Sequence, residues 1–146
     1  MTDENRDVAI HQLNSYLREE NAAVETYDEM IGRTDDEHVI AVLRDNRISH
    51  AVRAYLLTNL ILQLGGVPAD RDGVWESFAK VVERGERKFG ASTAIEALEV
   101  SEIKRLRDYT QVHPSVVPHV RRIVARNLLP EQEITHGAMS LLKNAV

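Results

Sequence analysis

Five polar residues occupy positions where the core faces of helical segments would normally carry apolar side chains. They are Glu20, Arg47, His50, Glu102 and Glu131. Each lies near the middle of its segment and continues a stripe of apolar residues spaced by three and four. Ionised groups are rarely buried without a partner, because desolvation costs several kcal/mol per ion. Five such residues at one level therefore predict a single polar constellation inside the protein.

Two kinds of chemistry suit these residue types. Arg47 has five N–H donors in a planar fork, so it could bind two carboxylates at once in a metal-free ion network with His50. Helix bundles also hold pairs of metal ions in their cores. Such sites use one Glu from each of two helices and a Glu-x-x-His pair from each of the other two. Residues at i and i+3 share a helix face, so a carboxylate and an imidazole at this spacing can meet the same ion.

The Glu-x-x-His pairs are incomplete in this chain. The second helical segment reads Arg47-Ile-Ser-His50, and the fourth reads Glu131-Gln-Glu-Ile134. A literal pair exists at Glu133-Ile-Thr-His136, but His136 falls nearly opposite the expected core stripe. Only a rotation at Pro130 would bring it inward, because proline removes a backbone donor and kinks a helix.

Three hypotheses follow for the constellation. The first is the ion network, and the second is a single metal ion held by Glu20, His50, Glu102 and Glu131. The third is a di-metal site, of iron or manganese, that recruits Glu133 and His136. We favour the ion network, because a cation at position 47 opposes the charge of two divalent ions.

The elements that must position these residues are helical throughout. Apolar periodicity predicts long helices over 3–31, 34–64, 92–112 and 115–144, and a shorter one over 73–89. The second helix is expected to begin at a capping box formed by Thr34 and Glu37. Gly65-Gly66-Val67-Pro68 should end it. Two short links and one long central connection predict an all-α four-helix bundle with a short extra helix in the crossover.

The two halves of the chain repeat one pattern. Glu20 is followed seven residues later by Tyr27, and Glu102 is followed seven residues later by Tyr109. This spacing indicates duplicated helical hairpins, with both tyrosines expected as core aromatics whose hydroxyls find a partner.

The segment Glu20-Asn-Ala-Ala-Val-Glu-Thr-Tyr27 resembles the first metal-ligand segment of bacterioferritins and rubrerythrins. With the central crossover and the mid-helix Glu102, the chain resembles the ferritin-like superfamily over residues 5–144. It also resembles a bacterial branch of unknown function, which reads like Leu64-Gly65-Gly66-Val67-Pro68 after its second helix. The resemblance implies a ferritin-like bundle and, with a full ligand set, a di-iron ferroxidase, peroxide-reducing enzyme or oxygenase.

The incomplete ligand set departs from that pattern at Arg47 and Ile134. The expected function is therefore that of a degenerate ferritin-like bundle with a structural, interaction or stress-associated role. The di-iron carboxylate protein is the alternative.

Composition limits the classes of protein to which this chain can belong. The chain has 146 residues, a net charge of −5 and no cysteine, which favours one domain and excludes disulfide scaffolds and thiolate chemistry. The acidic balance argues against nucleic-acid partners and anionic membranes. The polar start of the chain, without a signal-like stretch, leads us to expect a cytoplasmic location. Further apolar residues on the second helix suggest a homodimer; they are Val39, Val42, Leu56 and Leu60.

Overall fold

The computed structural model describes residues 1–70 and 91–145, and within these ranges it contains helices and their connections but no strand. The helices are α1 (Asp3–Gly32), α2 (Glu37–Gln63), α4 (Ala91–Thr110), α5 (Pro118–Ile123), the π-helical turn η2 (Val124–Leu128) and α6 (Leu129–Ala145). Because α5, η2 and α6 follow one another without a break, they form one long helix. The prediction of an all-α bundle of four long helices is confirmed. The helix expected over 73–89 lies outside the described residues.

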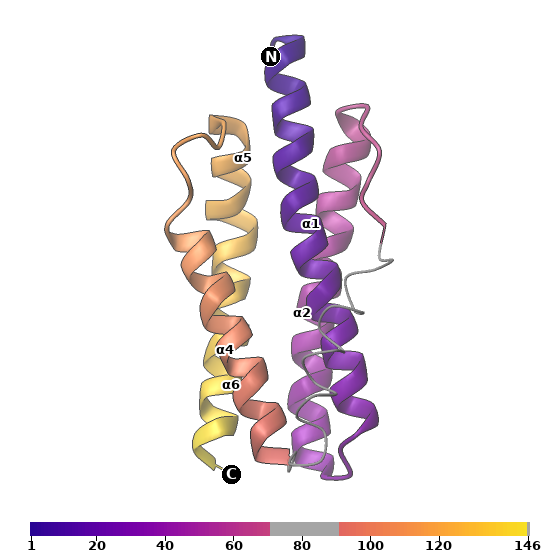
Figure 1. Cartoon of the computed structure of the whole chain (residues 1–146), viewed down its shortest axis with the longest axis vertical. Coiled ribbons are helices and arrows are strands. Elements are labelled where there is room, and N and C mark those ends of the chain that lie inside the picture. The colour runs from indigo at the N-terminus through magenta and orange to yellow at the C-terminus, as the bar shows by residue number, and fades with distance from the viewer. Residues whose placement is uncertain (71–90, 146) are drawn as a thin grey trace.

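Two antiparallel hairpins make up the bundle (Figure 1). One consists of α1 and α2, and the other of α4 and the continuous helix α5–η2–α6. The end of α2 and the start of α4 lie at opposite ends of the bundle, so α2 and α4 run in the same direction. This is the arrangement that one long central connection requires. No helix in the described ranges is long and apolar enough to cross a membrane.

The start of α2 differs from the predicted capping box. The N-cap is Asp36, whose carboxylate accepts hydrogen bonds from the backbone N–H groups of His38 (2.9 Å) and Val39 (3.2 Å). A carboxylate at this position both caps the free N–H groups and interacts favourably with the helix dipole. Glu37 is therefore the first residue of the helix, and Thr34 lies in the link before it.

The predicted stop after α2 is confirmed. Gly65 has a φ of 82°, in the left-handed region that favours glycine, and the N–H of Gly66 donates to the carbonyl of Ile61 (2.9 Å). A Cβ at Gly66 would lie 2.6 Å from the side chain of Ile10 on α1. The second glycine thus allows the turn to pack closely against the neighbouring helix.

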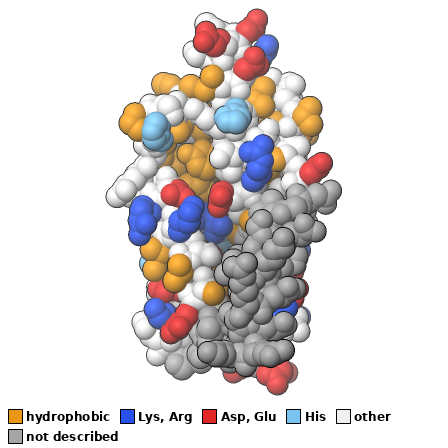
Figure 2. Space-filling view, in the orientation of Figure 1, with side chains coloured by type: hydrophobic (Ala, Val, Ile, Leu, Met, Phe, Trp, Pro, Cys, Tyr) orange, Lys and Arg blue, Asp and Glu red, His pale blue; other side chains and the backbone are white. Residues whose placement is uncertain are grey.

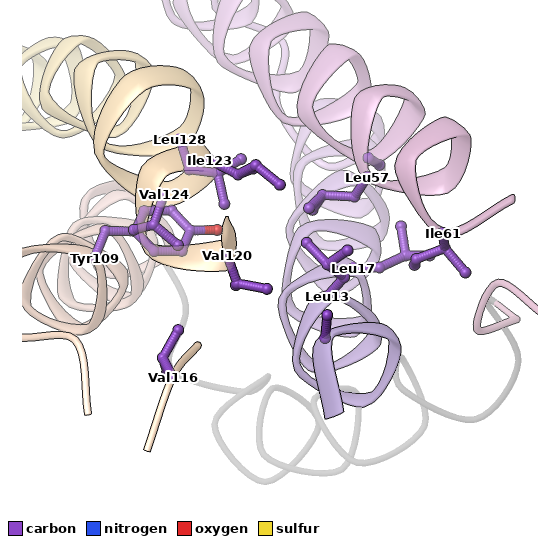
Figure 3. Packing of buried hydrophobic residues seen from close by; sticks show 12 residues of the cluster. Leu13, Leu17, Leu57, Ile61, Tyr109, Val116, Val120, Ile123, Val124 and Leu128 are labelled. Carbon is purple, nitrogen blue, oxygen red and sulfur yellow. The ribbon is translucent and has the colours of Figure 1, made fainter. Parts of the chain in front are cut away.

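Two apolar clusters form the core, one toward each end of the bundle. The first, shown in Figure 3, includes Leu13, Leu17, Leu57, Ile61, Val120, Val124 and Leu128. The second includes Met30, Val39, Leu43, Ile95, Leu98, Met139 and Leu142. Along α1, α2 and α4 the buried Glu20, His50 and Glu102 fall between the two clusters. A polar level therefore separates two hydrophobic ones.

The π-helical turn shifts the buried face of the last helix. The stripe expected from an uninterrupted α-helix continues from Val124 through Asn127, Glu131, Ile134, Ala138 and Leu141. The residues that are buried after Val124 are instead Leu128, Gln132, Thr135, Met139 and Leu142. A π-turn closes i to i+5 hydrogen bonds and so adds one residue to the turn. Every core position after η2 consequently moves by one residue. The helix irregularity expected at Pro130 is thus found just before this proline, at Val124–Leu128.

Candidate functional site

His50 stands at the centre of the polar level. Its Nδ1 lies 2.6 Å from Oε2 of Glu20, and its Nε2 lies 2.6 Å from Oε1 of Glu102. All three side chains are at most 1% exposed. An ionised carboxylate can only accept, so this geometry requires a proton on both ring nitrogens. His50 therefore bridges α1 and α4 as an imidazolium between two carboxylates.

Arg53 supplies the second buried cation. Its Nη1 donates to Oε1 of Glu20 (3.3 Å) and to the side-chain carbonyl of Gln132, and its Nη2 donates to Oγ1 of Thr135 (3.1 Å). The side chain is 1% exposed. Together His50 and Arg53 balance the charges of Glu20 and Glu102. A buried pair of carboxylates is stable only with such compensation.

On α6 a pair of neutral side chains faces Glu102. Nε2 of Gln132 (2.5 Å) and Oγ1 of Thr135 (2.8 Å) both donate to Oε2 of this carboxylate. Gln132 and Thr135 are three residues apart and share one helix face. They occupy the spacing at which a metal-binding bundle carries Glu-x-x-His. An amide and a hydroxyl thus take the places of a carboxylate and an imidazole.

Two tyrosines complete the network, and each one contacts the glutamate of the opposite hairpin. Tyr27 on α1 donates to Oε1 of Glu102 on α4 (2.7 Å), and Tyr109 on α4 donates to Oε1 of Glu20 on α1. Asn46 on α2 donates to the hydroxyl of Tyr27 (3.1 Å). The expectation that both tyrosines lie in the core with a partner for the hydroxyl agrees with these contacts.

The electrostatics follow from burial and from these contacts. Burial alone would raise the pKa of Glu102, but the hydrogen bond and charge of His50, with the hydrogen bond from Tyr27, lower it to about 2. Burial likewise opposes ionisation of Glu20, and the charges of His50 and Arg53 outweigh it, so its pKa is lowered. Burial and the adjacent carboxylates raise the pKa of Tyr27 and of Tyr109 well above the ordinary tyrosine value. At neutral pH the carboxylates are therefore ionised and the phenols protonated.

Arg47 does not belong to this network, so its predicted place in the core is wrong. Its side chain is 35% exposed and pairs with Asp28 on α1. Position 47 lies at the surface beside α1, whereas Asn46 and Arg53 are buried and contact both α1 and α6. The spacing of three and four residues that marks a core face predicted Arg47 to be buried, because Arg47 precedes His50 by three residues. Arg53 follows His50 by three residues and satisfies the same rule.

The candidates on the fourth helix are also displaced. Glu131 is exposed and accepts a hydrogen bond from Ser49 at the surface (3.1 Å), and Glu133 is exposed as well. His136 is half-buried, with Nε2 3.4 Å from Oγ of Ser140 on the same helix. None of the three reaches the polar level, because η2 brings Gln132 and Thr135 there instead. Sequence reasoning missed Gln132 and Thr135 as site residues. The signal that could have found them is their i, i+3 spacing, one residue after Glu131 and Ile134 of the predicted apolar stripe.

A metal ion does not fit the donor set. In the described part of the chain, no three His, Asp or Glu side chains form a group that could hold a metal ion. Glu20, His50 and Glu102 come closest, but His50 directs its two nitrogens to different carboxylates. The guanidinium of Arg53 lies against Glu20, where it repels a second cation.

Comparison with models of protein families, with curated proteins and with solved structures finds no match for this chain. The fold and the site by themselves define its class. It is an all-α bundle of four long helices with a buried, charge-balanced polar network between two apolar clusters.

Proposed function

We propose that the protein is a degenerate ferritin-like bundle in which protein cations replace the metal centre, and that it has a structural or interaction role. The observation that carries this proposal is the position of Arg53. Its guanidinium contacts Glu20 from α2 and also Gln132 and Thr135 from α6. It thus does from inside the protein what a bound cation would do, which is to neutralise inner carboxylates.

The pattern of positions supports the ferritin-like part of the proposal. A di-metal bundle takes one Glu from each of two helices, and Glu20 on α1 and Glu102 on α4 hold those places. It takes an i, i+3 pair from each of the other two helices. On α6 that pair is Gln132 and Thr135, and on α2 only His50 remains, since Arg47 pairs with Asp28 at the surface. The framework of a metal centre is present while half of its donors are replaced.

Unfolding measurements test the role of Arg53, with Arg47 as a matched control on the same helix. Arg53→Ala leaves Glu20 buried without one of its cations, so we expect a loss of about 3–5 kcal/mol in the free energy of unfolding. Arg47→Ala removes a partly exposed ion pair and should cost about 1 kcal/mol or less. Equal losses for the two variants would contradict the assignment.

Elemental analysis tests the metal-free interpretation directly. After incubation with Fe(II) in air, the wild-type protein should carry far less than one iron per chain. Two irons per chain would overturn the proposal and establish the alternative, a di-iron carboxylate protein. A single equivalent of bound iron or manganese would support the mononuclear site instead.

The interaction role rests on the outward face of α2. Four of its apolar side chains are more than half exposed and follow one helical face: Ile48, Val52, Tyr55 and Leu62. The homodimer expected from the sequence rested on a different set of apolar residues, which are less exposed than these four. Val39 is buried, and Val42, Leu56 and Leu60 are half-buried within the chain. We propose a homodimer in which two α2 helices cross antiparallel at Tyr55. In that arrangement Ile48 of one copy meets Leu62 of the other, as a two-fold axis requires.

A further inference from the structure

A groove of about 520 Å³ opens between α1 and α4. Its size is within the range of small-molecule sites. The residues that matter for its chemistry are Tyr16, Glu19, Lys104, Arg105, Asp108 and Tyr109. In Figure 2, which shows the face formed by α1 and α4, charged side chains of both signs gather at mid-height below a hollowed area with hydrophobic side chains. The proposed function does not use this groove.

Arg105 lines the groove and has one donor for which the described residues provide no acceptor. The side chain is 8% exposed, and its Nη2 donates to the backbone carbonyl of Glu19 (3.2 Å). Within residues 1–70 and 91–145, its buried Nε has no hydrogen-bond partner. Burial opposes the charge, but the nearby carboxylates of Glu20 and Glu102 outweigh it and raise the pKa of Arg105. A buried, charged guanidinium with an unpaired N–H carries a desolvation cost, which a hydrogen bond to a ligand acceptor would reduce.

Two tyrosine rings add an aromatic surface beside Arg105. Tyr16 and Tyr109 pack edge to face, with ring centroids 5.6 Å apart and an interplanar angle of 60°. Both line the groove. Tyr109 is held by its hydrogen bond to Glu20, so its ring has a fixed position. Tyr109 is buried and Tyr16 is half-buried, so a ligand in the groove meets the cation together with the ring of Tyr16, which Tyr109 supports.

The charges around the groove favour a monoanion. Lys104 and Arg105 are matched by Asp108 and Glu19, so a ligand anion must take the place of one acidic partner. A monoanion then restores the balance, whereas a dianion leaves an excess negative charge. The acidic partners are themselves displaceable. The Lys104–Asp108 pair (2.9 Å) is exposed, and Glu19 is half exposed with its carboxylate 3.8 Å from Arg105. Exposed pairs of this kind contribute little to stability.

We propose that this groove binds a small organic monocarboxylate with a flat apolar body. The carboxylate accepts from the guanidinium of Arg105, for which a planar two-oxygen acceptor is the best match. The body lies against the half-buried ring of Tyr16, which packs on the buried ring of Tyr109. Inorganic phosphate lacks the apolar body and carries more charge than the lining can balance.

Titrations of the full-length ¹⁵N-labelled protein test this proposal with three probes. Benzoate should give saturable amide shifts along 12–19 and 104–111, with a Kd on the order of 1 mM, as expected for so few atoms. Benzyl alcohol has the same ring without the charge and should bind at least about tenfold more weakly. Inorganic phosphate should produce no saturable shifts at these amides. Equal binding of the alcohol or the phosphate would overturn the proposal, as would the absence of shifts with benzoate.

Variants locate the site. Arg105→Gln should weaken benzoate binding at least about tenfold, whereas Arg107→Gln, an exposed arginine on the same helix outside the groove, should leave it unchanged. Ser15→Trp keeps the proposal testable if Arg105→Gln fails to fold. Ser15 is an exposed residue of the groove, so a large ring there should abolish binding without lowering the melting temperature. Unchanged affinity in Ser15→Trp would overturn the location.

Discussion

The hydroxyl of Tyr27 donates a 2.7 Å hydrogen bond to Glu102, a carboxylate 75 residues further along the chain. Tyr109 makes the reciprocal contact to Glu20. Each tyrosine lies two helical turns beyond the glutamate of its own helix and cannot reach it. Because α1 and α4 run in opposite directions, each tyrosine arrives beside the glutamate of the other helix. The sequence repeat is thereby turned into a reciprocal connection between the two hairpins.

Removing one hydroxyl should weaken this connection measurably. Tyr27→Phe and Tyr109→Phe should each lower the free energy of unfolding by about 1.5–3 kcal/mol, the range for hydrogen bonds to charged groups. Urea denaturation measures the change. Tyr55→Phe is the matched control, because Tyr55 is 71% exposed and its hydroxyl should contribute less than about 0.5 kcal/mol. If Tyr27→Phe is as mild as the control, the reciprocal connection is not a source of stability.

Acid should destabilise the protein through the inner carboxylates. A carboxyl whose pKa is lower in the folded state contributes stability that is present above its unfolded pKa and is lost as the pH falls. For Glu102 the change from 4.5 to about 2 corresponds to about 3 kcal/mol, lost progressively between these pH values. Glu20 should add a loss of the same sign, because its pKa is also lowered.

Unfolding curves recorded from pH 7 down to pH 3 check this, with Glu102→Gln as the comparison. The variant should be less stable at pH 7, because it lacks the charge that pairs with His50. Its stability should fall less between pH 4.5 and pH 3, because one of the titrating groups is gone. Parallel pH profiles for the two proteins would contradict the assignment.

Metal binding should appear when the replaced donors are restored. The triple variant Arg53→Ala, Gln132→Glu, Thr135→His removes the internal cation and rebuilds Glu-x-x-His on α6. The variant loses the charge of Arg53 and gains a third buried carboxylate, for which His50 alone does not compensate. It should therefore be poorly stable alone and stabilised by Mn(II). At a hundredfold excess over the Kd, the gain is about 2.7 kcal/mol.

The control for this experiment uses the literal motif that lies outside the polar level. Adding Glu133→Gln and His136→Ala to the triple variant should not change its response to Mn(II), since Glu133 is exposed and His136 contacts Ser140 on its own helix. Thermal melts with and without Mn(II) measure the response. Loss of the response in this control would show that Glu133 and His136 take part after all.

The proposed homodimer depends on the apolar face of α2. Light scattering at tens of micromolar protein should give twice the mass of one chain. Tyr55→Glu and Val52→Glu place charges at the centre of the proposed contact and should return the protein to a monomer without lowering its helical content. Leu141→Glu, on an equally exposed apolar residue of α6, should leave the dimer intact. A monomeric wild type under these conditions would refute the proposal.

Apolar periodicity alone predicted the four long helices and the burial of Glu20, His50 and Glu102, because spacings of three and four define a core face locally. The same periodicity cannot separate neighbours at the edge of that face. Arg47 and Arg53 both lie three residues from His50, and only the packing of α2 between α1 and α6 decides which one is buried.

The fourth helix shows the second limit. The π-helical turn at Val124–Leu128 adds one residue and so places Gln132 instead of Glu131 at the polar level. The spacing of the apolar residues before this turn does not predict the change. The hydrogen bonds between helices that define the site join residues 19 to 89 positions apart. The sequence by itself therefore determined where the four long helices form and that Glu20 and Glu102 are buried in them. Only the tertiary structure decided which cations and donors meet those carboxylates, because that choice depends on helix rotation and register and not on local spacing.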